Sequence, residues 1–398
     1  MNLNPGSFGK FNKQLEWIAS VAEEEERLTL AAYPNYKNSP LSLEQIRDIT
    51  EDMSIIYSEE EEKSKPYLDP SPFRFDENIF LYTTIPEALK EILAFLKDID
   101  DDLYKMTLNI YLGQSTDSIN IYSIHEERYR NKIKSGELES DSHNKGGEFR
   151  KTAYIVLDKE LDFLAAKKIN KILGLKKCSF FEKISIMHET AHFFDKPKFK
   201  KALTLADLVN PNFEPFPQLT ASLLAETTAI FFAIIFAQFL VQKTPALQTI
   251  ADKIIEKRIL LNTFAVEKTY AITSLLSSKR DYGYIPADFL NDFVDEPEAQ
   301  DFIDDLVAYP HIHHDKRYSL SQLFVPTMVK IYNENKEAGK ARIKRYIDCC
   351  RNDDLMGALK SFDLDITNQK NYNYLLENFR EFISKYYFKN KLDPDIDR

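Results

Sequence analysis

The chain has 398 residues, of which 43% are apolar and 29% charged, a composition typical of a globular protein that excludes wholesale disorder. Only 10 residues are glycine, about 2.5% against a usual share of about 7%, which disfavours hairpin-rich barrels, sandwiches and glycine-loop nucleotide-binding folds. The net charge of −11 disfavours nucleic-acid binding, because an acidic surface repels phosphate backbones. We therefore expect a mainly helical protein.

The first hundred residues have the apolar spacing of amphipathic helices. Helices are predicted over 11–32 and 42–63, the second beginning after a serine that can cap its N-terminus. Thr84 and Pro86 begin a third helix, because proline is well tolerated in a first helical turn. We expect residues 1–105 to form an N-terminal helical lobe.

After these helices, apolar and polar residues alternate along the chain, as they do in β-strands. Strands are predicted over 107–112, 118–124 and 152–157, and the polar stretch 135–147 between them is predicted to be an exposed loop. We therefore expect a small sheet within residues 106–158, inserted into an otherwise helical chain.

Residues 219–241 are almost wholly apolar, and about 23 residues are long enough to cross a bilayer. Glu226 is the single charged residue of this run. The run is either a membrane span with a costly carboxylate or a helix buried on all sides within the protein. A single mid-chain span without flanking basic clusters is the less favoured interpretation, so we expect no stable membrane insertion.

His188 and His192 are four residues apart, so on a helix their imidazoles lie on one face, one turn apart. This geometry can supply two nitrogen ligands at about 2.0–2.1 Å to a tetrahedral zinc ion. Glu189 is adjacent to His188 and would point toward the open coordination position, where it can deprotonate a zinc-activated water. The H-E-x-x-H pattern is short and also arises by chance, in which case the histidines are ordinary core residues.

A third ligand is needed, and Glu226 is the candidate, 34 residues after His192 on the apolar helix. A carboxylate in such a helix costs several kcal/mol unless it is paired, hydrogen-bonded or bound to metal. The prediction is one Zn2+ per chain, held by His188, His192 and Glu226. The alternative is a carboxylate hydrogen-bonded to its surroundings.

Three further polar residues near this motif have open roles. Asp195 follows His192 by three residues and would either fix the tautomer of a ligating histidine or face water. Thr227 and Thr228, next to Glu226, could support the ligands by hydrogen bonding.

At these residues the sequence resembles the thimet oligopeptidase and oligoendopeptidase F family of gluzincin zinc metallopeptidases, loosely and over roughly residues 146–388. Three blocks carry the resemblance: Gly146-Gly147-Glu148-Phe149 with 152–157; His188 to His192 with Glu226-Thr227-Thr228-Ala229; and Tyr309-Pro310-His311 with Tyr318. The chain departs from the family at Ala191, Asp195 and Ala229, where the family has glycine, histidine and serine. It is also hundreds of residues shorter, so the family's restriction to oligopeptides is not implied.

The resemblance implies a mainly α (α+β), two-lobed, zincin-like fold with a small β-sheet next to the zinc-binding helix. It places this sheet at 106–158, the zinc helices at 179–243 and a C-terminal helical lobe at 246–398, all within a catalytic region of residues 106–398.

The resemblance also implies a zinc-dependent metalloendopeptidase with Glu189 as general base. Tyr318 would donate to the developing oxyanion, with Tyr309 as the substitute if the alignment is shifted. The resemblance also includes His311 among the catalytic residues. An edge strand would pair with an extended peptide substrate. Its residues are Ala153, Tyr154, Ile155 and Val156. His313 and His314 complete the histidine cluster after Pro310, and the sequence assigns them no role beyond an exposed polar turn.

Other functions remain open at this stage. The chain could be a toxin-type gluzincin specific for one protein, or a catalytically inert peptide-binding or membrane-associated helical protein on the same scaffold. The expected partner is a peptide or protein substrate, and the oligomeric state is not predicted. The three cysteines suggest neither disulfides nor a zinc site, and no Sec signal is visible. We therefore expect a cytoplasmic protein, or one secreted without a Sec signal peptide.

Overall fold

The structure is a computed structural model. It describes residues 8–64, 82–138, 143–146, 151–157, 177–196, 219–286, 289–294, 299–308, 310 and 312–385. The described chain is mainly helical, as the composition predicts, and carries two small sheets.

The helices are, in chain order, α1 (Asn12–Ala32), α2 (Leu43–Ser64), α3 (Ile85–Ile99), α4 (Asp101–Tyr111), α5 (Glu127–Lys134), α7 (Phe180–Ala191), α9 (Leu219–Lys243), α10 (Gln248–Tyr282), α11 (Ala299–Ala308), α12 (Ile312–Glu334), α13 (Lys336–Arg351), α14 (Leu355–Ser361) and α15 (Gln369–Ile383). The strands are β1 (Thr83–Thr84), β2 (Ser118–Ser123), β3 (His143–Gly146), β4 (Lys151–Leu157) and β5 (Lys177–Cys178).

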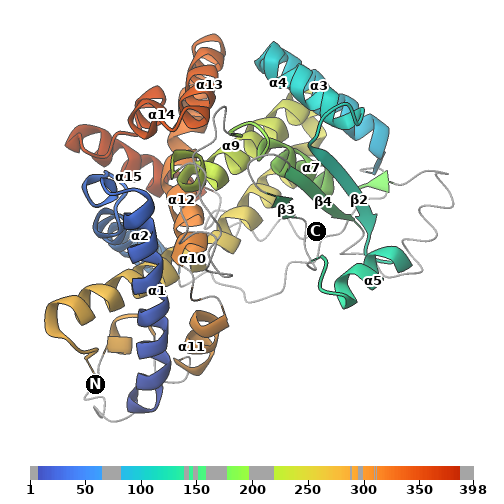
Figure 1. The fold of residues 1–398 in the computed structure, drawn as a ribbon. Helices are drawn as coiled ribbons and strands as arrows, with labels where there is room; N and C mark the ends of the chain where they lie inside the picture. Colours follow the sequence, from blue (N-terminus) through green and yellow to red (C-terminus); the bar gives the residue numbers. More distant parts are fainter. Residues whose placement is uncertain are drawn as a thin grey trace.

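The three helices predicted in the first hundred residues are confirmed as α1, α2 and α3. Thr84 caps α3, since its hydroxyl accepts a hydrogen bond from the Glu87 amide and the Glu87 carboxylate accepts one from the Thr84 amide at 2.9 Å. Such reciprocal capping satisfies two amides that have no partner within the helix. The helices of 1–105 lie in two places, however: α1 and α2 lie beside α10, α12 and α15, whereas α3 and α4 lie across the molecule near α9 (Figure 1).

The strand predicted over 107–112 is wrong, because residues 107–111 belong to α4 and Leu112 is its C-cap. The Asp100 side chain accepts hydrogen bonds from the amides of Asp102 and Leu103, so the helix has a strong N-terminal cap. Leu103, Thr107 and Ile110 are buried at helical spacing, and this buried stripe outweighs the local alternation. The expected domain boundary at residue 105 falls inside this helix, and the division into lobes stays a prediction.

The two other predicted strands are confirmed as β2 and β4, and they form a three-stranded sheet in the order β2-β4-β3. β2 runs parallel to β4, with Ser118 opposite Thr152, whereas β3 runs antiparallel, with Asn144 opposite Ala153. Part of the predicted loop 135–147 is therefore the strand β3. The sheet lies beside α7 (Figure 1). The short pair β1–β5 brings the start of α3 next to the start of α7.

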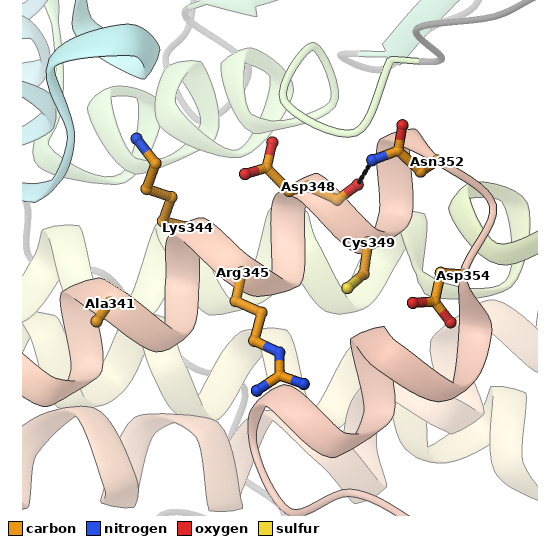
Figure 2. A pocket seen from close by; sticks show the side chains of 7 residues that line it. All are labelled: Ala341, Lys344, Arg345, Asp348, Cys349, Asn352 and Asp354. Atoms are coloured by element: carbon orange, nitrogen blue, oxygen red, sulfur yellow. Dashed lines mark hydrogen bonds between the residues drawn. The ribbon is translucent and has the colours of Figure 1, made fainter.

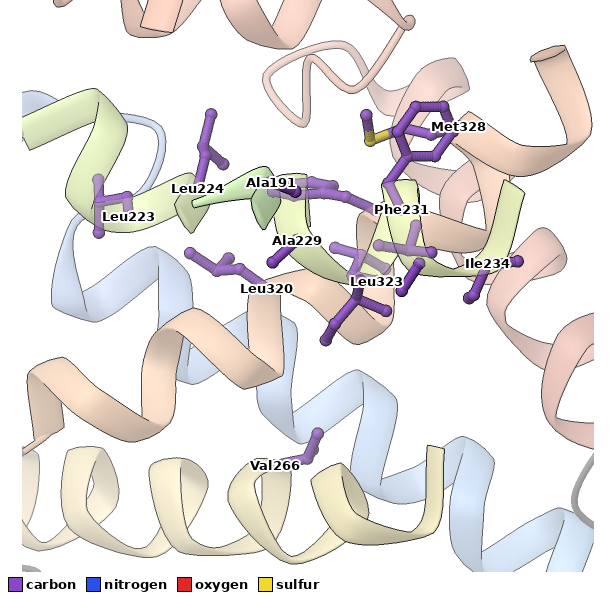
Figure 3. Close-up of a cluster of buried hydrophobic side chains, with 14 of the residues drawn as sticks. Ala191, Leu223, Leu224, Ala229, Phe231, Ile234, Val266, Leu320, Leu323 and Met328 are labelled. Atoms are coloured by element: carbon purple, nitrogen blue, oxygen red, sulfur yellow. The ribbon is translucent and has the colours of Figure 1, made fainter. Parts of the chain in front are cut away.

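α9 is the central helix of the core. Figure 3 shows its side chains among those of α12 and the end of α7, with Val266 of α10 on the far side of the same core cluster. The labelled residues are Ala191, Leu223, Leu224, Ala229, Phe231, Ile234, Val266, Leu320, Leu323 and Met328. Among the described residues, α9 is the one helix with the length and composition of a membrane span. Since 78% of its most apolar window is buried against other parts of the chain, the protein itself accounts for its apolar character.

Phe232 ties this helix to the site region. Its side chain is fully buried, and its ring makes edge contacts with Phe194, after α7, and with Phe95 of α3. Phe232→Ala is expected to lower the free energy of unfolding by about 3–5 kcal/mol, the usual cost of removing a buried aromatic ring. Phe232→Leu should cost clearly less because it leaves a smaller cavity. Denaturant unfolding of both variants checks this, and equal losses would contradict it.

Candidate metal centre

The predicted motif helix is confirmed as α7, and it is fixed at its start. Ser179 and Glu182 form a reciprocal cap, with the Ser179 amide donating to the Glu182 carboxylate at 2.7 Å. The buried Lys183 ammonium lies 2.5 Å from the Glu91 carboxylate of α3. His188 and Glu189 lie in the last turn of this helix, and His192 is its C-cap residue.

The structure brings the three predicted metal ligands together. Nε2 of His188 lies 3.5 Å from Oε2 of Glu226, and Nε2 of His192 lies 3.6 Å from Oε1 of the same carboxylate. One ligand atom from each residue lies within 4.8 Å of the other two. The side chains are only 9–12% exposed, so the cluster is almost closed to solvent. The packing of α7 on α9 therefore brings His192 close to the Glu226 carboxylate.

These residues fit a metal ion. Ligands at about 2.0–2.2 Å from a tetrahedral ion lie roughly 3.4 Å from one another, close to the two nitrogen–oxygen distances here. Oε2 of Glu226 is buried and has no hydrogen-bond partner in the described structure. A buried carboxylate oxygen without such a partner is costly, and a bound cation would satisfy it. His188, His192 and Glu226 are thus a candidate metal site, whereas their spacing does not fix the identity of the ion.

The protonation of the cluster also suits metal binding. Burial lowers the pKa of His192 to about 3, with the neighbouring His188 acting in the same direction and Glu226 opposing both. Burial disfavours the charged form of Glu226, but the His192 and His188 imidazoles outweigh burial and hold the pKa of this carboxyl below its usual value. A neutral imidazole and an ionised carboxylate are the forms that bind metal ions.

The charges of two carboxylates of this region, Glu226 and Glu189, both act on Tyr318. The charge of Glu226, then burial, then the charge of Glu189 raise the pKa of Tyr318 well above its usual value. Its hydroxyl therefore lies within electrostatic reach of both carboxylates and keeps its proton at neutral pH. Glu189 itself is buried, 6% exposed. Glu189 follows His188 on α7 and Tyr318 lies on α12, and their roles as general base and hydroxyl donor stay predictions.

Sequence reasoning missed a positive charge at this site. Arg317 lowers the pKa of His192, of Glu226 and of Tyr318, so its guanidinium is close enough to influence all three. It immediately precedes Tyr318 on α12, and that adjacency is the signal from which it could have been found.

Asp195 is neither exposed nor shown to contact a histidine ring. Its side chain is 1% exposed, so the interpretation that it faces water is wrong. Its Oδ1 lies 3.4 Å from Nζ of Lys151, and the same Nζ donates to the His192 carbonyl at 2.6 Å. Burial raises the pKa of Asp195, and the Lys151 charge opposes that shift. Lys151 thus links the Asp195 carboxylate to the His192 carbonyl.

The two threonines after Glu226 differ. Thr228 donates to the Leu224 carbonyl at 3.1 Å and lies 3.3 Å from the Tyr346 hydroxyl, so it serves helix packing. The Thr227 hydroxyl is buried without a partner in the described structure. A different hydroxyl supports the motif: Tyr111 lies 2.9 Å from the Thr190 hydroxyl and so joins the end of α4 to α7.

The prediction that residues 153–156 are an edge strand needs correction. β4 is the middle strand, so Ala153 and Tyr154 are paired on both sides, with β2 and with β3. Their backbone groups are already hydrogen-bonded and cannot pair with a peptide as well. Ile155 and Val156 pair with β2 and are buried. The edges of this sheet are β2 and β3, and contact of residues 153–156 with substrate stays a prediction.

Several predicted residues lie outside the described part. Tyr309 and His311 are outside it, as are Gly147, Glu148 and Phe149 of the first resemblance block. His313 and His314 lie in the first turn of α12, and their side chains are outside the described part.

A separate surface hollow lies on α13. It has a volume of about 350 Å³, and Figure 2 shows the lining residues Ala341, Lys344, Arg345, Asp348, Cys349, Asn352 and Asp354. The Asn352 amide donates to the Asp348 carbonyl at 2.8 Å within it. Its charges are mixed and it contains none of the metal ligands, so we do not place the reaction there.

The comparisons agree with the architecture. No protein-family model and no curated protein matches the chain. The fold is similar to the crystal structure of a "putative peptidase from Chlamydophila abortus", with a TM-score of 0.55 and 13% identity. The similarity covers 95% of this chain but 61% of that one, so this chain spans less than two thirds of its length. The chain thus has a fold similar to that of this protein and carries a candidate metal site at His188, His192 and Glu226.

Proposed function

We propose that this protein is a zinc-dependent metalloendopeptidase of the gluzincin type. The observation that carries the proposal is the almost closed His188–His192–Glu226 cluster, in which a buried Glu226 oxygen lies 3.5 Å from a His188 nitrogen and makes no hydrogen bond among the described residues. Glu189, the proposed general base, follows His188 in the motif, and the charges of Glu189 and Glu226 both act on Tyr318, the proposed hydroxyl donor. The similarity of the fold to that of a putative peptidase supports it independently of these residues.

Each residue has one task in this mechanism. His188, His192 and Glu226 would hold the ion, which supplies Lewis-acid polarisation and a water of lowered pKa. Glu189 takes the proton from the attacking water and later gives it to the leaving amine. Tyr318 donates its hydroxyl hydrogen to the scissile carbonyl oxygen as negative charge develops there. The Arg317 charge favours the same developing anion.

The substrate class follows from the sheet beside α7. An exposed edge strand can pair with an extended peptide through backbone hydrogen bonds, which gives affinity without strong sequence demands. We propose that the peptide lies along this sheet at one of its two edge strands, β2 or β3, whose shared partner β4 packs on α7.

Glu226→Ala tests the ligand set. The variant loses one of three protein ligands, and changes outside a ligand set already cost about 10–100-fold in metal affinity, so at least this loss is expected. Zinc affinity measured by competition with a chelating dye checks it. Thr228→Ala, two residues further along α9 and outside the ligand set, is the control. Full zinc retention by Glu226→Ala would remove Glu226 from the ligand set.

A peptide library tests the function. Protein stripped of metal and then reloaded with zinc should cut many library peptides, and the stripped protein should cut none. Cleavage of one protein but no peptides would favour the toxin-type alternative. Tight zinc binding without any cleavage would contradict the proposed function and favour an inert peptide-binding protein.

A further inference from the structure

Lys151, the first residue of β4, reaches the end of the motif helix. Its Nζ donates to the His192 carbonyl at 2.6 Å and lies 3.4 Å from the Asp195 carboxylate. Its backbone amide donates to the Asp117 carboxylate at 2.8 Å. Lys151 is therefore held at its backbone by one carboxylate while its side chain binds the turn that carries a metal ligand.

That turn needs an external partner. His192 is the C-cap of α7, so its carbonyl lies beyond the last regular hydrogen bond of the helix. Helix ends without such partners fray, whereas His188 lies one turn inside. A lysine at this place both satisfies the carbonyl and interacts favourably with the negative end of the helix dipole. Lys151 thus fixes the backbone of the ligand that the helix itself holds least.

A second lysine nearby makes a comparable ion pair but does not touch the ligand backbone through its side chain. Nζ of Lys196 lies 2.8 Å from both oxygens of Asp117. The Lys151 and Lys196 side chains are similarly exposed, 24% and 21%, and each pairs with a nearly buried aspartate. The two lysines thus differ in the bond that only Lys151 makes to the His192 carbonyl.

We propose that Lys151 is a positioning residue of the metal centre. It holds the His192 backbone so that the His192 imidazole can bind the same ion as His188 and Glu226. This inference rests on the proposed metal site and extends it to β4, because the lysine joins the sheet to the metal-binding turn. Asp195 lies 3.4 Å from the ammonium and keeps it in place.

The test separates this bond from the charge pair. Lys151→Met alone would leave Asp195 buried and uncompensated and could fail to fold, so the informative variant is Lys151→Met/Asp195→Asn. This variant should fold, which thermal unfolding of the zinc-free protein checks. It should bind zinc about 10–100-fold more weakly in a dye competition. Asp195→Asn alone and Lys151→Arg keep a donor to the carbonyl and should bind zinc as wild type does.

Lys196→Met/Asp117→Asn is the matched control, because it removes the other lysine–aspartate pair while the asparagine oxygen can still accept from the Lys151 amide. It should lower the unfolding temperature of the zinc-free protein because it removes this ion pair, and leave zinc affinity unchanged. With Co2+ as the probe, the absorption bands of the bound ion should shift in Lys151→Met/Asp195→Asn only. Wild-type zinc affinity in Lys151→Met/Asp195→Asn, or an equal loss in Lys196→Met/Asp117→Asn, would overturn the inference. Absence of zinc binding by the wild type would overturn it together with the proposed function. Tight binding without peptide cleavage would overturn the proposed function alone.

Discussion

Glu189→Gln is expected to keep the fold and the bound zinc while peptide cleavage falls by about 10²–10⁴-fold, the usual contribution of general acid–base catalysis. The physical reason is that Glu189 moves protons and is not a metal ligand, and glutamine preserves its size and buried position. The measurement is the rate of cleavage of one peptide, compared at equal zinc content.

Glu182→Gln is the control for this variant. It makes the same substitution on the same helix. Glu182 caps the start of α7, and glutamine can form the same cap, so cleavage should be unaffected. Normal activity of Glu189→Gln would show that the H-E-x-x-H interpretation itself is wrong.

Tyr318→Phe should lower kcat by about 10²–10³-fold, the cost of removing one oxyanion donor. KM should change little, because the hydroxyl acts mainly when negative charge develops on the carbonyl oxygen. The raised pKa of Tyr318 keeps this hydroxyl protonated across the neutral range, so it remains a donor. Steady-state kinetics on one peptide separates kcat from KM.

Tyr332→Phe on the same helix is the matched control, since Tyr332 packs against Phe231 in the core and should be neutral for activity. If Tyr318→Phe is fully active and Tyr309→Phe is not, the role of the oxyanion donor belongs to Tyr309.

Local spacing in the sequence was enough to predict the metal ligands. Histidines four apart on a helix must share a face, and a lone carboxylate in an apolar helix needs a partner, so His188, His192 and Glu226 could be joined without coordinates. The same local rules predicted α1, α2, α3, α7 and α9.

Prediction from local spacing failed where the same residues fitted both the strand period and the helix period. Residues 107–112 alternate like a strand, but the Asp100 cap and the buried stripe of Leu103 and Thr107 make them helical. This error concealed Tyr111 as the residue of α4 that holds Thr190. Likewise, alternation identifies β4 as a strand but cannot show that β3 pairs beside it, because strand order depends on contacts distant in sequence.

The supporting residues could not be predicted for a related reason. Lys151 and the His192 carbonyl are 41 residues apart, and Arg351 donates to the Phe194 carbonyl at 2.6 Å from 157 residues away. Lysine and arginine at a strand start or a helix end have no local signature that distinguishes them from surface charges. Only the packing of β4 and α13 around the end of α7 reveals them.

The most direct test of the central claim is a zinc titration of the metal-stripped protein, followed by the rate of peptide cleavage. We predict that cleavage rises linearly with added zinc and stops rising at one ion per chain, and that Glu226→Ala needs far more zinc to reach any activity. Cleavage by the stripped protein that is indifferent to zinc would contradict the account, as would the absence of cleavage at every zinc concentration.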